Sequence, residues 1–374
     1  MRRLLTVAVA ALALLFCGQS RAGLPKPDAR AFYVVNASNG EVLAAHDAHM
    51  RVPIASITKL MTVIVALDHL KPDQIVTVTG DAAEVGESRI PLTRGQQISV
   101  HDLLEGALIQ SANDAADALA SAASGDDVPK FVRWMNERAK RLGLRDTHFV
   151  RPDGLDAVGH LSSAHDVAVL AQVAMHRALV REIVVKRSDT IEGGTFVVHT
   201  WNDLLGVYPG VIGVKTGHTN DAGWCQVAAV RRNGYTLYAV ILGSPTRSQR
   251  NADLERLLTW GVAQYRTLTL VERKTYALAA APFGRPAVPL VATAPLVRVV
   301  RVGRPVVERI VAPTVVSLPV RRGQRLGRIE LFSGRKQIGM RPLLAARSVH
   351  RPGFGGRLRW YGTRTVHDLV GLFS

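Results

Sequence analysis

The sequence predicts an α+β domain, in which an antiparallel sheet is flanked by helices, followed by a small all-β domain. Apolar residues recur at helical spacing in several long stretches, and runs rich in Val, Ile, Tyr and Phe before and after these stretches are separated by turn residues. Beyond residue 270 the runs of Val, Ile and Leu become short, and Pro or Gly interrupts them every several residues. That pattern is typical of a β-sandwich or a small barrel.

The elements of the first domain can be taken in chain order. Asn39-Gly40 lies between two strand-like runs, which indicates a hairpin. Ser162 or Ser163 is a suitable N-cap for the helix that follows it. The expected helices and strands are strands 31–35 and 41–45, a helix from 56, a β piece at 74–79, helical segments within 103–123 broken by a turn at 111–114, helices 128–144 and 161–175, strands 211–215, 225–230 and 235–241, and a helix at 253–265.

The second domain is expected to contain five strands, at 288–290, 296–302, 306–311, 315–320 and 325–332. After it comes a tail, 347–374, rich in arginine. Its residues Val366, Leu369, Val370 and Phe373 would share one face of a helix. Two interpretations stay open for this tail: an amphipathic anchor at a membrane surface, or a short helix packed on the β domain.

The N-terminus has the features of a secretory signal peptide. Arg2 and Arg3 precede an apolar run from Leu4 to Phe16, and small residues stand at 20 and 22. The run is too short for a membrane span, which needs about 20 apolar residues. The expected division is therefore a signal peptide at 1–22, a first domain at 23–270, a basic β domain at 271–346 and the tail at 347–374. We expect an exported protein on the outer side of the cytoplasmic membrane, and after cleavage a single cysteine, Cys225, too few for an internal disulfide.

Charge is distributed very unevenly along the chain. Residues 23–270 hold 25 Lys and Arg against 26 Asp and Glu, whereas residues 271–374 hold 19 against 4. A basic region of this kind predicts an anionic partner. Because the protein is expected to be exported, a membrane surface or an acidic wall polymer is a better candidate than nucleic acid.

The chemistry is expected to centre on Ser56 and Lys59, which are three residues apart at the start of an apolar helix. Residues with this spacing lie side by side on a helix. A serine hydroxyl becomes a good nucleophile only when a neighbouring base takes its proton, and lysine can be that base only if burial and a second cation lower its pKa. Serine-x-x-lysine occurs often by chance, so the pair indicates a catalytic site only when further motifs accompany it.

Two further motifs follow in order, Ser111-Ala112-Asn113 and Lys215-Thr216-Gly217. A glycine directly after Lys-Thr lets another backbone approach an edge strand closely, which suits the binding of an extended peptide. With these three motifs the chain resembles the low-molecular-mass penicillin-binding proteins that act as serine-type D-alanyl-D-alanine carboxypeptidases. The resemblance covers about residues 25–265 and includes Gly154-Leu155-Asp156 with Ser162-Ser163-Ala164, and Leu257-Leu258-Thr259-Trp260-Gly261.

The resemblance implies a penicillin-binding/β-lactamase-like fold and a role for each motif. Ser56 would attack the carbonyl of the penultimate D-alanine of a peptidoglycan stem peptide, with neutral Lys59 as base. Ser111 and Lys215 would relay a proton to the departing D-alanine, and Asn113 would bind the substrate amide. β-Lactams would acylate the same serine, and no cofactor is implied.

The resemblance also implies binding groups for the two ends of the scissile region. Backbone N–H groups of Ser56 and His218 would form the oxyanion hole. Lys215, Thr216 and Gly217, together with Arg250, would bind the substrate and its free carboxylate, for which the planar fork of arginine is suited.

The sequence departs from the family at two positions and leaves three alternatives. Ala112 replaces the commoner glycine, and Asp153 stands where several relatives have histidine, which affects deacylation. A β-lactamase would need a carboxylate for the deacylating water, for which Asp153 or Asp156 is the nearby candidate. A DD-endopeptidase would use the same site, and so would a slow penicillin-binding or wall-binding protein. His160 and His165 lack further metal-ligand spacing, so no metal is expected.

Overall fold

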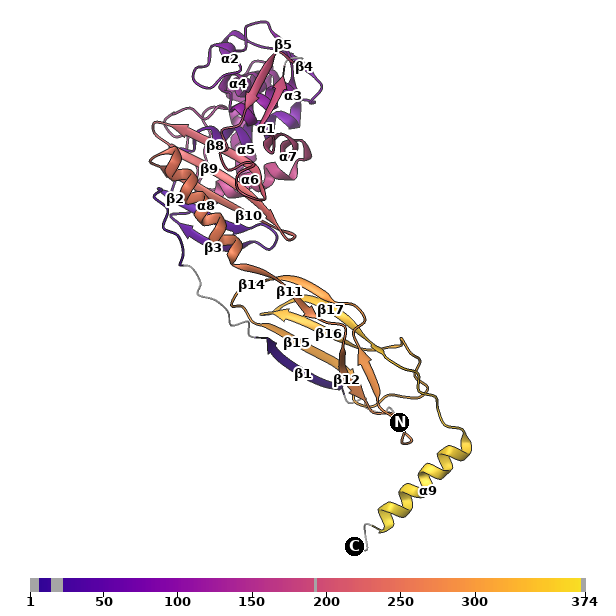
Figure 1. Ribbon diagram of the computed structural model, residues 1–374. Coiled ribbons are helices and arrows are strands. Elements are labelled where there is room, and N and C mark those ends of the chain that lie inside the picture. The colour runs from indigo at the N-terminus through magenta and orange to yellow at the C-terminus, as the bar shows by residue number, and fades with distance from the viewer. Residues whose placement is uncertain (1–6, 15–22, 192–193, 371–374) are drawn as a thin grey trace. The chain divides into compact units, whose positions relative to one another are not determined.

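The computed structural model describes residues 7–14, 23–191 and 194–370, with side chains described for 23–191 and 194–362 (Figure 1). The chain divides into two compact units. The first is Ala22–Ala263, and the second begins at Gln264 and includes an N-terminal strand, Val7–Leu14. Each unit has its own cluster of buried apolar residues. The predicted cleavage after residue 22 stays a prediction.

The sheet of the first unit is antiparallel and five-stranded, in the order β3-β2-β10-β9-β8 (Figure 1). Asn36 and Gly40 close the predicted hairpin, where the Gly40 N–H donates to the Asn36 carbonyl over 2.8 Å. The last strand in the order, β8, forms an edge of the sheet, as predicted from Lys-Thr-Gly. The strands are β2 (Ala31–Asn36), β3 (Glu41–His46), β8 (Val211–Thr219), β9 (Gly223–Arg232) and β10 (Tyr235–Ser244).

Helices cover both faces of this sheet, which confirms the predicted architecture. Tyr33 and Val35 of β2 face the large core around the buried helix α1, where α6 also packs. Between them Val34 points to the other face and lies beside Gly261 of α8. The helices are η1 (Ala55–Thr58), α1 (Lys59–His69), α2 (Gly80–Glu84), α3 (Val100–Glu105), the π-helical turn η2 (Gly106–Gln110), α4 (Asn113–Ser124), α5 (Val128–Arg141), α6 (Ala164–His176), α7 (Ala178–Val184) and α8 (Arg247–Ala263).

Local capping explains where several of these helices begin. The Ser163 hydroxyl accepts the N–H of Asp166 at the start of α6, and the Asp127 carboxylate accepts the N–H of Lys130 at the start of α5. Two small two-stranded sheets complete the unit, β4 (Ile75–Thr77) with β5 (Gln97–Ser99), and β6 (Ser188–Ile191) with β7 (Phe196–His199).

The second unit is built of two antiparallel sheets, so the predicted all-β domain is confirmed. A six-stranded sheet has the order β1-β15-β16-β17-β13-β12, and β11 pairs with β14. Leu296 of β14 packs against Gly339 of β17, which brings the two sheets together over one core. The strands are β1 (Val7–Leu14), β11 (Tyr265–Val271), β12 (Thr275–Ala279), β13 (Val288–Val291), β14 (Leu296–Arg301), β15 (Val306–Pro313), β16 (Arg325–Ser333) and β17 (Lys336–Ala345).

One predicted strand of this unit is wrong. The segment 315–320 makes only isolated bridges, at Val315 and Val320, although Val316 and Val320 are buried. Pro319 lacks the N–H that a continuous ladder requires, so apolar content here reflects burial without pairing. Strands β11, β12 and β17 were not predicted. Val7–Leu14, which lies in the predicted signal peptide, pairs with β15.

The predicted C-terminal helix is present as α9 (Phe354–Val370). Phe283 packs edge-on against Trp360 and Tyr361 near its start. The apolar face expected at Val366, Leu369 and Val370 involves side chains outside the described part, as does Phe373. Within the described residues, no helix has both the length and the apolar character required to span a membrane.

Candidate active site

Ser56 and Lys59 meet at the junction of η1 and α1. Ser56 lies in the 3₁₀ turn of η1, and Lys59 is the first residue of α1. The prediction placed both on one α-helix. The tighter turn brings residues three apart almost into register, and Lys59 Nζ lies 2.7 Å from Ser56 Oγ. Ser56 faces the cavity described below, whereas Lys59 is completely buried behind it.

The amine of Lys59 has an acceptor for each of its three N–H groups. Besides Ser56 Oγ, these are Asn113 Oδ1 and the carbonyl oxygen of Asp153, each at 2.7 Å. Burial lowers the pKa of Lys59 to about 8, against the opposing effect of the carboxylates of Asp153 and Asp117. At pH 7 on the order of one lysine in ten is then neutral, far more than for an exposed lysine.

The second motif comes from the turn between η2 and α4, as predicted. Ser111 ends η2 in a left-handed conformation with φ of 65°, and Asn113 begins α4. The turn reverses the chain so that the Asn113 amide reaches Lys59. The backbone of Asn113 is bonded to the preceding loop, because the Asn113 N–H donates to the Ser88 carbonyl over 2.7 Å.

The third motif lies on the edge strand β8. Lys215 Nζ donates to Ser111 Oγ over 2.8 Å and to the carbonyl of Thr216 over 3.0 Å. Lys215 is also buried, and its pKa is held well below the usual lysine value by burial and by the positive charges of Lys59 and Arg250.

Gly217 allows β8 to lie directly against the nucleophile turn. A Cβ at this position would lie 2.9 Å from the Ile54 carbonyl oxygen and 3.0 Å from the Ser56 nitrogen. Only glycine leaves room for this contact, so the backbone of β8 runs beside the Ser56 N–H. His218, the next residue, lines the cavity and packs against Trp224, with the rings tilted by 32° and their centroids 4.0 Å apart.

Arg250 reaches the same cavity from α8. The helix begins at Arg247, six residues before the predicted start at Asp253, because the turn at Thr246 accepts the Arg250 N–H and continues into the helix. The Arg250 guanidinium is buried and donates to Asp203 Oδ2 over 3.1 Å, and it lies 5.7 Å from the centre of the Trp224 ring. Burial lowers its pKa to about 10.

These residues converge on one open cavity of about 640 Å³. Seven of the nine predicted site residues line it, and Lys59 and Lys215 are buried behind it. Five further lining residues were not predicted from the sequence, since no motif or spacing distinguishes single Trp, Arg, Glu and Ser residues. The lining residues are Ser56, Ser111, Asn113, Thr216, Gly217, His218 and Arg250 among the predicted ones, and Glu87, Ser88, Trp201, Trp224 and Arg247 among those missed.

The two loop carboxylates considered for a β-lactamase are held elsewhere. Arg151 binds the Asp153 carboxylate through two N–H groups, at 2.5 and 2.6 Å. Asp156 accepts the Thr219 hydroxyl at 2.6 Å. Neither residue is among the described residues that line the cavity, and Asp153 has no exposed surface. Neither is therefore available to activate water at Ser56.

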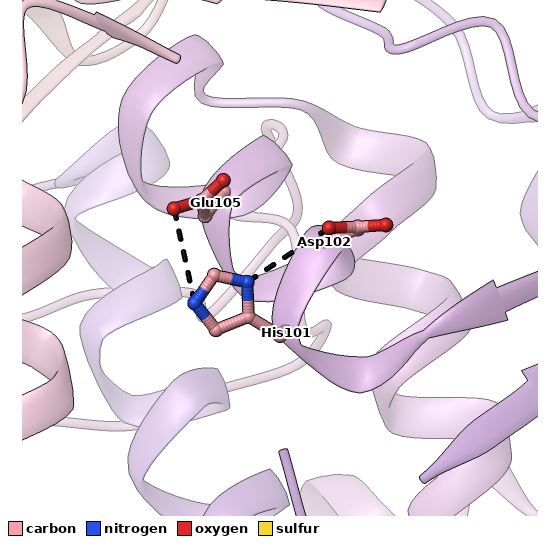
Figure 2. A group of neighbouring side chains, drawn as sticks. All are labelled: His101, Asp102 and Glu105. Atoms are coloured by element: carbon pink, nitrogen blue, oxygen red, sulfur yellow. Dashed lines mark ion pairs between the residues drawn. The ribbon is translucent and has the colours of Figure 1, made fainter. Parts of the chain in front are cut away.

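Three side chains on α3 could suggest a metal site away from this cavity: His101, Asp102 and Glu105 (Figure 2). The Asp102 carboxylate lies 3.8 Å from Nδ1 of His101, and the Glu105 carboxylate lies 3.9 Å from Nε2. Because the two carboxylates lie near different nitrogens, one ion could not replace both of these contacts. Lys186 also pairs with Glu105. The group is explained as an ion-pair cluster. His160, considered earlier, bonds Thr58 Oγ1 at 2.8 Å, and His165 bonds Asp166.

Comparison with known proteins identifies the family. The sequence profile of the D-alanyl-D-alanine carboxypeptidases (Peptidase_S11) matches residues 19–246, more than half of the chain. The D-alanyl-D-alanine carboxypeptidase DacC of Escherichia coli (strain K12) is 32% identical over 382 residues, which cover 95% of this chain and 93% of DacC. The chain belongs to the D-alanyl-D-alanine carboxypeptidase family. It is a serine peptidase of the penicillin-binding, cell-wall class.

Further relatives agree with this assignment along nearly the whole chain. DacF of Bacillus subtilis (strain 168), another D-alanyl-D-alanine carboxypeptidase, is 31% identical over 341 residues, covering 87% of both chains. The solved structure of penicillin binding protein 5 from Haemophilus influenzae is 28% identical, covers 88% of this carboxypeptidase and all of that chain, and has a TM-score of 0.65. The prediction of a low-molecular-mass penicillin-binding protein with a C-terminal β domain is confirmed.

Proposed function

We propose that this carboxypeptidase removes the terminal D-alanine of peptidoglycan stem peptides through an acyl-enzyme on Ser56. The observation that carries the proposal is the 2.7 Å contact between Ser56 Oγ and the buried amine of Lys59. Neutral Lys59 takes the hydroxyl proton as Oγ bonds to the carbonyl carbon of the penultimate D-alanine. The negative charge that develops on the carbonyl oxygen is stabilised by the N–H groups of Ser56 and His218, on the two backbones that Gly217 allows to approach.

Collapse of the tetrahedral intermediate breaks the C–N bond, and the leaving amine needs a proton. Ser111 and Lys215, 2.8 Å apart on the other side of the cavity, supply it in this proposal. Water then cleaves the ester and regenerates Ser56. Asn113 holds Lys59 in position and binds the amide of the acyl donor through its remaining N–H.

The free carboxylate of the substrate is proposed to bind Thr216, Arg250 and Lys215. Burial and the positive charges of Lys59 and Arg250 hold the pKa of Lys215 well below its usual value, and a bound carboxylate would favour its charged form. Arg250 is oriented by Asp203 and by the Trp224 ring, so its fork is largely fixed before substrate binds.

The decisive test measures D-alanine released from Nα,Nε-diacetyl-Lys-D-Ala-D-Ala by the mature protein. Release by the wild type and its loss in Ser56→Ala are expected. Labelling by fluorescent penicillin that persists in Ser56→Ala would contradict the assignment of the nucleophile. A slow penicillin-binding protein would be labelled but would release little D-alanine, and a DD-endopeptidase would release D-alanine slowly but cleave cross-linked stem dimers.

We further propose that the protein is exported and binds an anionic surface through its basic C-terminal region. The apolar leader at 1–22 and the excess of 19 Lys and Arg over 4 Asp and Glu beyond residue 270 support this. Removal of 347–374 is expected to move the protein from the membrane fraction to the soluble fraction. Unchanged partitioning would rule out the tail as an anchor without affecting the proposed reaction.

A further inference from the structure

Glu87 is a charged cavity residue to which the proposed reaction gives no role. Of the described residues that line the cavity, Glu87 alone carries a carboxylate, whereas Arg247 and Arg250 contribute guanidinium groups. No hydrogen bond or ion pair within the described part of the chain engages the Glu87 side chain, which is exposed. A carboxylate that faces a substrate cavity and has no partner is available for a ligand.

The backbone of Glu87 is held tightly by the catalytic motif. Asn113 Nδ2 donates to the Gly86 carbonyl over 2.9 Å, and the Asn113 N–H donates to the Ser88 carbonyl over 2.7 Å. Ser88 Oγ in turn donates to the Gln110 carbonyl over 2.9 Å. The residues on both sides of Glu87 are therefore fixed to Asn113 and its neighbours, which is unusual for an exposed loop residue.

Glu87 itself has a φ of 65°. A long side chain is uncommon in this left-handed region, and its cost is tolerated only where the surroundings impose it. In this conformation the carbonyl groups on both sides of Glu87 accept hydrogen bonds from Asn113, and the carboxylate of Glu87 lies at the cavity. The backbone of Glu87 is thus held by the site, and its side chain lines the cavity.

The location within the cavity indicates which part of the substrate Glu87 meets. Thr216 and Gly217 of the edge strand β8 line the cavity together with Asn113 and with Glu87 and Ser88 of the loop before it. An extended peptide that pairs with β8 turns alternate side chains to the two faces of the sheet. The proposed function assigns the amide of the acyl donor to Asn113, to which both neighbours of Glu87 are bonded, so the side chain near Glu87 belongs to the acyl donor.

We propose that Glu87 is a specificity residue that binds a primary ammonium group on the side chain of the residue preceding D-Ala-D-Ala. This rests on the substrate orientation in the proposed function. A single exposed ion pair contributes modestly, and a charge-assisted hydrogen bond somewhat more, so we expect a preference for the cationic side chain of roughly three- to tenfold in kcat/KM.

The test compares two peptides that differ only in this charge, Nα-acetyl-Lys-D-Ala-D-Ala and Nα,Nε-diacetyl-Lys-D-Ala-D-Ala. The wild type should prefer the free amine, and Glu87→Gln should bring the ratio of the two kcat/KM values close to one. Because Glu87 also raises the pKa of Lys59, the substitution affects both peptides in the same way, and the ratio removes that effect. Glu84→Gln, an exposed change at the end of α2, should keep the wild-type ratio.

A charge reversal gives a second measurement. Glu87→Lys should favour Nα-acetyl-Nε-succinyl-Lys-D-Ala-D-Ala, whose side chain ends in a carboxylate, over Nα-acetyl-Lys-D-Ala-D-Ala, whose side chain ends in the free amine. Equal ratios in the wild type and Glu87→Gln would overturn the proposal, as would slower release of bound penicillin by Glu87→Gln at an unchanged peptide ratio, which would make Glu87 a base for water. Failure of the wild type to release D-alanine from either peptide would instead contradict the proposed function.

Discussion

At the scale of single residues, the buried amine of Lys59 predicts how acylation depends on pH. Lys59 must be neutral to take the proton of Ser56, and burial lowers its pKa to about 8. The second-order rate constant for acylation by benzylpenicillin should therefore rise about tenfold per pH unit below 8 and level off above it. Stopped-flow or labelling measurements between pH 5.5 and 9.5 test this. A rate that does not change below pH 8 would mean that Lys59 is not the base.

The charge of Asp117 should influence the pH below which the rate of acylation falls. Its carboxylate raises the pKa of Lys59, and its own pKa is raised to about 7, mainly by burial. Asp117→Asn removes the negative charge, which makes the charged form of Lys59 less stable and lowers its pKa. The acid limb of the acylation profile should then move to lower pH. Movement to higher pH, with folding verified by circular dichroism, would contradict the electrostatic role of Asp117.

Replacing Arg250 by lysine removes the planar guanidinium group while keeping a positive charge. Arg250→Lys retains one cation but cannot make two parallel hydrogen bonds to a carboxylate. With about 1.5–3 kcal/mol for a hydrogen bond to a charged group, kcat/KM for the diacetyl tripeptide should fall by roughly 10- to 100-fold. Arg133→Gln, which changes an exposed arginine on α5, is the control and should leave kcat/KM unchanged. An effect of Arg250→Lys below threefold would remove Arg250 from carboxylate binding.

At the scale of elements, two glycines of one loop separate backbone strain from packing. Gly154 and Gly159 have φ of 86° and 83°, but a Cβ on Gly154 would lie 2.2 Å from the Ala55 carbonyl oxygen, while a Cβ on Gly159 has no neighbour closer than 3.9 Å. Gly159→Ala should cost about 1 kcal/mol of unfolding free energy from φ alone. Gly154→Ala should cost about 3 kcal/mol more, since η1 must move.

Gly154→Ala should also slow penicillin acylation, because displacement of η1 disturbs the contacts of Ser56 and Lys59. Thermal unfolding and fluorescent penicillin labelling of both variants measure the two effects. Equal losses of stability in Gly154→Ala and Gly159→Ala would show that the clash with η1 is relieved without cost.

Local chemistry decided which helices and strands could be predicted from the sequence alone. Helices with a clear apolar face and a capping Ser163, and strands around Asn39-Gly40, were predicted within a few residues because local chemistry determines them. The segment around Val316 was mistaken for a strand since burial and pairing give the same apolar signal. At the site, motif residues were found by their spacing. Glu87 and Trp201 were missed because only the folded loops bring them to the cavity.

At the scale of the whole molecule, each unit has its own core, and every described residue of the cavity belongs to Ala22–Ala263. The sheet of the first unit is completed by residues within that unit, from β2 to β10. The lining residues therefore need no strand of the second unit. The positive charge belongs to the other unit, because nearly all of the excess of Lys and Arg lies beyond residue 270.

Removal of the second unit should consequently separate catalysis from surface binding. A protein of residues 23–263 should be labelled by penicillin and release D-alanine within about twofold of the mature chain, since its core and cavity are intact. The mature chain should sediment with vesicles that contain anionic lipid, less so as salt is raised from 50 to 500 mM, because each Lys or Arg near such a surface contributes about 1 kcal/mol that salt screens. The fragment should stay in the supernatant. Sedimentation of the fragment, or binding of the mature chain to purely zwitterionic vesicles at high salt, would mean that the basic region is not what binds the surface.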